Sequence, residues 1–116
     1  KTCFNTHVSL PHYHPKYWRQ RNCFYDVKNL KKHYDLVIVD GPNGNGRAIS
    51  YLHIKDRVHK GSHILIDDHN CKDGDFDYKF VEYLKNIIPV KEIYTHENNI
   101  NPSWETGVNF AFFEVV

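Results

Sequence analysis

Hydrophobic residues gather in four main runs that are separated by more polar stretches. The runs YDLVIVDG (34–41) and HILIDD (63–68) are continuous and largely aliphatic, which is typical of strands buried on both faces of a sheet. VKEIYTH (90–96) and VNFAFFEVV (108–116) predict two more strands. We therefore expect one sheet with strands over residues 35–40, 63–67, 90–95 and 108–115. A short strand is also expected at HVSL (7–10), ended by Pro11.

Three other stretches space their apolar residues at the helical period. Residues 47–59 end at Lys60-Gly61, a normal C-terminal stop, and residues 77–88 end at Pro89. A shorter amphipathic helix is expected over residues 26–34. The apolar positions behind these expectations are Val27, Leu30, Tyr34, Ala48, Tyr51, Leu52, Val58, Phe76, Phe80, Leu84 and Ile87.

The order strand, helix, strand, helix, strand, strand predicts an α/β fold. Residues 1–116 are expected to form a single domain with a three-layer, mostly parallel sheet. The last two strands are linked too briefly for a helical crossover, so this pair should be antiparallel.

The composition limits which binding partners and which cellular compartment we expect. Fifteen Lys and Arg against fourteen Asp and Glu give no field that would attract nucleic acid or an anionic membrane. No apolar run is long enough to span a bilayer. Cys3, Cys23 and Cys71 are dispersed, which favours reduced thiols and a cytoplasmic protein. The sequence has no methionine, so we expect a processed chain or part of something longer.

The segment GPNGNGRA (41–48) raises the question of a phosphate-binding P-loop. Gly41 and Gly46 have the glycine spacing of that motif, but Arg47 and Ala48 stand where it needs lysine and a hydroxyl residue. Alanine cannot ligate a metal ion, so ATP and GTP should bind no better than a non-specific anion. Arg47 itself is expected to meet an anionic acceptor or to be solvated.

Acidic residues follow two of the predicted strands. Asp40 follows LVIV, and Asp67-Asp68 follows ILI, with His69 next along the chain. In an open α/β sheet, ligands bind beyond the carboxyl ends of the strands. Carboxylates with an imidazole suit Mg²⁺ or Mn²⁺, or a general base. The alternative is structural: Asp40 ties down the Gly-Pro turn, and Asp68 caps the next segment.

At these residues the sequence resembles a family. YDLVIVDGPNG, GR and HKGSHILIDDHN are similar to the fourth and fifth strands of class I S-adenosylmethionine-dependent methyltransferases. HVSLP resembles the third strand, and VKEIYTH and VNFAFFEV resemble the closing antiparallel hairpin, so the likeness covers nearly the whole chain. It implies a Rossmann-like sheet with strand order 3-2-1-4-5-7-6. The VDGPxG and GR segments are also similar to polysaccharide-modifying methyltransferase domains.

The resemblance implies a set of functional residues. In the metal-dependent branch of the family, an acid after the fourth strand and an acid–amide pair after the fifth hold magnesium. These positions correspond to Asp40, Asp68 and His69, with histidine in place of the amide. The same three residues are the predicted catalytic and metal-binding residues. The implied reaction is O-methyl transfer from S-adenosylmethionine, assisted by Mg²⁺ or Mn²⁺, to a small-molecule or saccharide acceptor.

The chain departs from the family at its start. The glycine-rich loop after the first strand and the ribose-binding acid after the second are not found, so the N-terminal strands are expected to be missing. Three functions stay open: a methyltransferase, a metal-dependent nucleotide or sugar-nucleotide transferase, and a non-catalytic Rossmann-like module without its cofactor half. A cofactor-binding strand end before residue 1 would favour the methyltransferase over the non-catalytic module.

Several other residues have both a functional and a structural interpretation. The histidines His7, His12 and His14 could contribute to a metal site or simply occupy an exposed loop. Trp104 could reach over an active-site mouth or pack. The clustered aromatic residues could line an acceptor pocket or cover the edge of the core; they are Tyr13, Tyr17, Trp18 and Tyr25.

Overall fold

The structure is a computed structural model of the 116-residue chain. It describes residues 2–3, 23–25, 27–41, 45–69, 72–73, 76–77, 79–96 and 109–116. The expected strand at 7–10, the histidines at positions 7, 12 and 14, most of the aromatic cluster and Trp104 lie outside these residues.

The described residues form three sheets, two of which have only two short strands each. These small sheets are the antiparallel pairs β1 (Thr2–Cys3) with β2 (Cys23–Phe24), and β5 (Lys72–Asp73) with β6 (Phe76–Asp77). The main sheet contains the four strands expected from the sequence. They are β3 (Leu36–Val39), β4 (His63–Asp67), β7 (Val90–His96) and β8 (Phe110–Val115).

The main sheet has the strand order β3-β4-β8-β7. β3 and β4 are parallel, whereas β8 pairs antiparallel with both β4 and β7. The α/β class and the antiparallel pairing of the last two strands are thus confirmed. The sheet is mixed rather than mostly parallel, because β8, the last strand in the chain, lies between β4 and β7.

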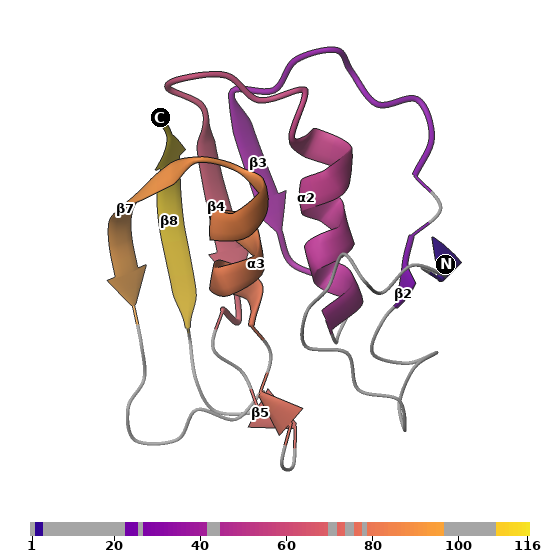
Figure 1. The fold of residues 1–116 in the computed structure, drawn as a ribbon, viewed down its shortest axis with the longest axis vertical. Helices are drawn as coiled ribbons and strands as arrows, with labels where there is room; N and C mark the ends of the chain where they lie inside the picture. The colour runs from indigo at the N-terminus through magenta and orange to yellow at the C-terminus, as the bar shows by residue number, and fades with distance from the viewer. Residues whose placement is uncertain are drawn as a thin grey trace.

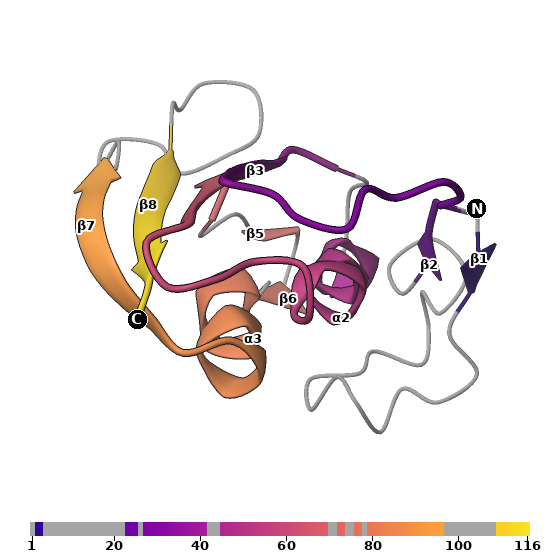
Figure 2. The ribbon, with the colours of Figure 1, turned by 90° about the horizontal axis from the view of Figure 1, so that it is seen from above.

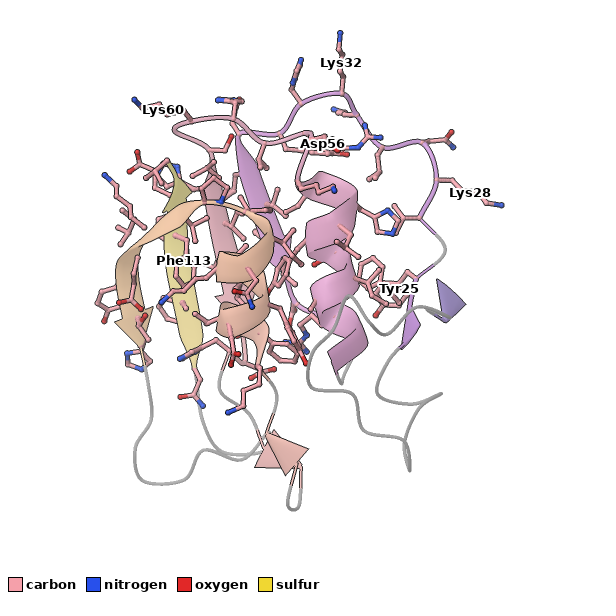
Figure 3. All side chains as sticks on the ribbon, in the orientation of Figure 1. Tyr25, Lys28, Lys32, Asp56, Lys60 and Phe113 are labelled. Carbon is pink, nitrogen blue, oxygen red and sulfur yellow. The ribbon has the colours of Figure 1, made fainter. Side chains whose placement is uncertain are left out.

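Two helices pack on one face of this sheet (Figures 1 and 2). They are α2 (Ile49–Ile54), which continues a 3₁₀ turn η3 (Asn45–Ala48), and α3 (Phe80–Ile87). Their apolar sides and the inward side chains of the strands form one core. In Figure 3, Phe113 of β8 lies among the strands and helices, whereas Lys32 and Lys60 project from the periphery. Core residues from both layers include Ile49, Tyr51, Ile64, Ile66, Phe80, Leu84 and Phe113.

The expectation of three layers is wrong for the described residues, which contribute helices to one face alone. Leu36 and Ile38 therefore remain 55% and 63% exposed, although the run LVIV predicted a strand buried on both faces. Their neighbours Val37 and Val39 point toward the helices and are more buried, as the two-residue period of a strand requires.

The helices differ from their expected ranges. α2 ends at Ile54, because the backbone tightens there into a turn in which the Arg57 and Val58 N–H groups both donate to the Ile54 carbonyl. Phe76 lies in β6 rather than in a helix, and α3 begins only at Phe80.

The expected helix over residues 26–34 is wrong for its described part, 27–34. Asn29 has a φ of +59°, a left-handed conformation that ends any helical turn at this point. Lys31 instead donates its N–H to the Tyr34 hydroxyl at 2.8 Å. The stretch runs in irregular form into β3.

In the described part of the chain, we find no helix with the length and apolarity to cross a membrane.

Candidate functional site

The acids at the carboxyl ends of β3 and β4 come together. The parallel register pairs Val39 with Ile66, so Asp40 and Asp67 are the next residues on adjacent strands. One carboxylate oxygen from each of Asp40, Asp67 and Asp68 lies within 4.8 Å of the other two. The structure thus brings together the predicted residues Asp40 and Asp68, and adds Asp67 between them. We call these three residues the acid cluster.

The backbone at Asp68 explains how two consecutive acids reach the same point. Successive side chains of a strand point to opposite faces, so Asp67 and Asp68 would diverge if β4 continued. Asp68 instead adopts a left-handed conformation with φ +52°, which aspartate tolerates better than most residues. Its N–H donates to the Asn109 carbonyl at 2.6 Å, which holds the turn against the start of β8.

The electrostatics of the acid cluster centre on Asp67. Partial burial, a hydrogen bond with the Asp40 side chain and the negative charges of Asp68 and Asp40 together raise the pKa of Asp67 to about 6. A proton bound there relieves the repulsion between neighbouring carboxylates. A divalent cation would relieve the same repulsion, because carboxylate oxygens are its ordinary ligands.

Arg47 anchors the end of β4 from the helix side. Its Nη1 donates to the Asp67 main-chain carbonyl at 2.6 Å, and its guanidinium carbon lies 4.8 Å from the centre of the Phe80 ring. The side chain is only 1% exposed. The alternative that Arg47 is solvated is therefore wrong, whereas a contact with an anionic acceptor stays a prediction. Its placement one helical turn before Tyr51, on the apolar side, was the available signal.

His69 is buried and does not belong to the group of ligand atoms around the acid cluster. It is 7% exposed and lies in the same turn as Asp68. The predicted role of His69 as a metal ligand and catalytic residue is a hypothesis that this geometry does not test.

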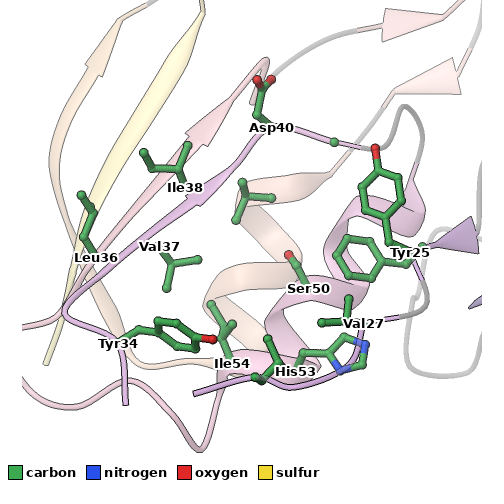
Figure 4. A pocket seen from close by; sticks show the side chains of 14 residues that line it. Tyr25, Val27, Tyr34, Leu36, Val37, Ile38, Asp40, Ser50, His53 and Ile54 are labelled. Carbon is green, nitrogen blue, oxygen red and sulfur yellow. The ribbon is translucent and has the colours of Figure 1, made fainter. Parts of the chain in front are cut away.

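A cavity of about 440 Å³ runs along β3, with Asp40 at one end and Tyr34 at the other (Figure 4). Tyr25 stands across from β3 and is half exposed. It approaches Gly41 so closely that a Cβ there would lie 3.0 Å from the Tyr25 hydroxyl. Tyr25 is the one described member of the sequence's aromatic cluster, and it lines this cavity; that the cavity takes an acceptor stays a prediction. The lining is mostly apolar and includes Val27, Leu30, Val37, Val39, His53 and Ile54.

Comparison with known proteins assigns neither a family nor a function to this chain. The chain matches no protein-family model, no curated protein sequence and no solved structure.

Proposed function

We propose that this chain is the carboxyl-terminal part of a class I methyltransferase-like domain and that it acts in O-methyl transfer from S-adenosylmethionine. The acceptor is a hydroxyl group of a small molecule or saccharide, bound at the acid cluster of Asp40, Asp67 and Asp68. The observation that carries this proposal is the order and direction of the strands in the main sheet.

The resemblance in the sequence implies strands four, five, seven and six side by side, in this order. The main sheet has β3, β4, β8 and β7 in the corresponding places. The unusual element is the last strand, which is inserted antiparallel between two strands that run the other way. A simple βαβ succession would have placed the last strand at the edge. The match therefore supports a Rossmann-like sheet of the methyltransferase type, whose remaining strands lie outside the residues described.

The acid cluster supplies the chemistry that an acceptor hydroxyl needs. S-adenosylmethionine provides the methyl group, and the attacking hydroxyl must lose its proton. With a pKa of about 6, Asp67 is ionised at neutral pH and yet basic enough to take up that proton. Asp40 and Asp68 lie within reach of the same point and hold the acceptor or a cation there.

Mg²⁺ or Mn²⁺ fits the acid cluster by its donor type, because three carboxylates converge on one volume. Such a cation would bind the acceptor hydroxyl and favour its ionised form. We keep His69 as a proposed fourth contributor on the strength of its place beside Asp68 in the sequence.

The cofactor is tested by isothermal titration calorimetry of the full-length protein, which in this proposal also supplies the cofactor-binding strands. We expect heat of binding with S-adenosylhomocysteine and none with ATP, because buried Arg47 donates to Asp67 rather than to a phosphate. ATP binding at micromolar concentration without S-adenosylhomocysteine binding would contradict the proposal and favour a nucleotide transferase.

The role of Asp67 is tested by the pH dependence of methyl transfer to a saccharide acceptor by the full-length protein without divalent cations, because a bound cation would lower the pKa of Asp67. The rate should rise as the pH passes about 6, because only the ionised carboxylate accepts a proton. Asp67→Asn should lower the rate by about 10²–10⁴-fold and abolish the inflection, while S-adenosylhomocysteine binding stays within a few-fold. Asp56→Asn, at an exposed acid that is not in the cluster, is the matched control. An unchanged profile in Asp67→Asn would mean that the acid cluster is structural.

A further inference from the structure

Two aromatic side chains lie beside the acid cluster along the same edge of the main sheet. β8 runs antiparallel to its neighbours, so it begins where β3, β4 and β7 end (Figure 1). The register pairs Asp67 with Phe110, and Phe110 with His96. Directly opposed residues project from the same face of a sheet, roughly 5 Å apart. We call Asp40, Asp67, Phe110 and His96, taken in this order across the sheet, the rim row.

The two rings of the rim row lie nearly parallel to each other. His96 stacks on Phe110 with 5.6 Å between the ring centres and an angle of 20° between the planes. Tyr94, one row further from the edge, leans on the same Phe110 ring with 5.7 Å between the centres. These contacts orient Phe110, which is half-buried, whereas His96 is exposed. The rim row therefore has a carboxylate half and an aromatic half.

The aromatic half is open to the same ligands as the carboxylate half. Both halves lie in the last row of side chains, on the face of the sheet that α2 and α3 do not cover. A second helical layer of the kind expected from the sequence would pack on the middle of this face, at Leu65 and Phe112, and the rim row lies beyond that middle. An acceptor that reaches Asp67 therefore also reaches Phe110.

The length and chemistry of the rim row indicate what binds there. Three strand spacings, or roughly 14 Å, separate Asp40 from His96, which is longer than a single sugar ring. Carboxylates accept hydrogen bonds from hydroxyl groups, and aromatic rings bury apolar C–H surface. A pyranose ring offers both, with hydroxyl groups around its edge and C–H groups on its face. Acidic sugars are disfavoured, because three carboxylates would repel them.

We propose that the rim row binds two adjacent units of a neutral oligosaccharide. The unit to be methylated lies at the acid cluster, and the next unit lies with its C–H face on Phe110 and a hydroxyl group at His96. Phe110 is thus a positioning residue, because binding of the second unit holds the first in place for reaction. This inference rests on the proposed function and narrows its acceptor to a neutral oligosaccharide.

Binding is tested with the full-length protein by saturation-transfer difference NMR. The probes are the neutral disaccharides cellobiose, maltose and mannobiose, with glucose and mannose as single-ring controls. Irradiation of the aromatic protons of the protein should transfer saturation to C–H protons of at least one disaccharide. Phe110→Leu should weaken the binding of this disaccharide about tenfold, because an aromatic anchor is lost. Phe112→Leu, the same change one row further from the edge, is the matched control and should bind within a few-fold.

Methyl transfer from S-adenosylmethionine, measured without divalent cations, gives a second readout. The kcat/KM for the bound disaccharide should exceed that for its monosaccharide about tenfold, since the second ring adds an aromatic contact. Phe110→Leu should remove this difference and leave the monosaccharide value within a few-fold. A merely structural role of Phe110 would instead lower both values together.

Three outcomes overturn the inference. They are a disaccharide affinity no higher than that of the monosaccharides, equal losses of affinity in Phe110→Leu and Phe112→Leu, and binding of the acidic disaccharide cellobiouronic acid as tightly as cellobiose. The proposed function fails separately. Disaccharide binding that depends on Phe110 without any methyl transfer would reject methyl transfer alone, and methyl transfer without a preference for disaccharides would reject the role of the rim row alone.

Discussion

The two faces of the main sheet use the same strands but differ in what covers them. On the helix face, Ile64, Ile66 and Phe113 are fully buried against α2 and α3. On the other face, which we call the open face, the described residues supply no helix, and Leu36 and Ile38 are more than half exposed. Alternation along a strand therefore separates residues that hold the fold from residues that are available for contact.

The open face is nevertheless not polar. Aromatic pairs follow β8 and its neighbours: His63 stacks on Phe112 at 5.1 Å, and His96 stacks on Phe110 at 5.6 Å. Asp40 follows Leu36 and Ile38 at the two-residue spacing of β3, and Asp67 follows His63 and Leu65 at the same spacing in β4. Both acids are therefore on the side of the open face. The acid cluster thus lies at the edge of an apolar surface, where an acceptor would meet both carboxylates and apolar side chains.

The largest expected difference between the faces is measured with neighbouring phenylalanines of β8. Phe113→Ala should cost about 3–5 kcal/mol in the free energy of unfolding, because it leaves a cavity in the core. Phe112→Ala, one residue earlier on the open face, should cost less than about 1.5 kcal/mol, because it removes a partly exposed ring. Urea denaturation gives both values. Equal costs would mean that the open face is covered.

A smaller effect on the free energy of unfolding is expected at Arg47, which binds the main chain of the acid cluster from the helix face. Arg47→Met removes the donor to the Asp67 carbonyl and should cost about 1–3 kcal/mol, because a buried acceptor loses its hydrogen bond. Arg57→Met is the control. It removes an exposed bond to the Lys31 carbonyl and a longer, part-buried one to the His53 carbonyl, and it should cost about 0.5–1.5 kcal/mol. Thermal unfolding followed by circular dichroism measures both. An unaffected Arg47→Met would show that Arg47 does not anchor β4.

The smallest effect concerns the acid cluster itself and pH. The folded pKa of Asp67, about 6, lies above its ordinary value of 3.8, so the folded state binds a proton more tightly than the unfolded state. Stability should therefore increase as the pH falls from above 6 toward 4, by less than about 1 kcal/mol once solvent screening is included. In Asp67→Asn this increase should disappear. A stability that falls over the same range in both proteins would contradict the raised pKa.

The sequence by itself determined which segments are strands. The runs at 35–40, 63–67, 90–95 and 108–115 predict the four strands of the main sheet to within about two residues at either end. Continuous apolar runs bounded by Gly, Pro and polar residues are local signals, so they need no knowledge of the partners. The sequence also located Asp40 and Asp68 as strand-end acids, because the end of an apolar run can be read directly from the order of residues.

Only the tertiary structure decided what surrounds those segments. A run such as LVIV is equally apolar whether one or two layers cover it, so the exposure of Leu36 and Ile38 depended on the placement of the helices. Asp67 belongs to the acid cluster because the parallel register places it beside Asp40. Asp68 reaches the same point because its own backbone adopts a left-handed conformation. Arg47 was buried because β4 brought a main-chain carbonyl to its guanidinium. Each outcome depends on a contact between segments far apart in the chain, which no local pattern specifies.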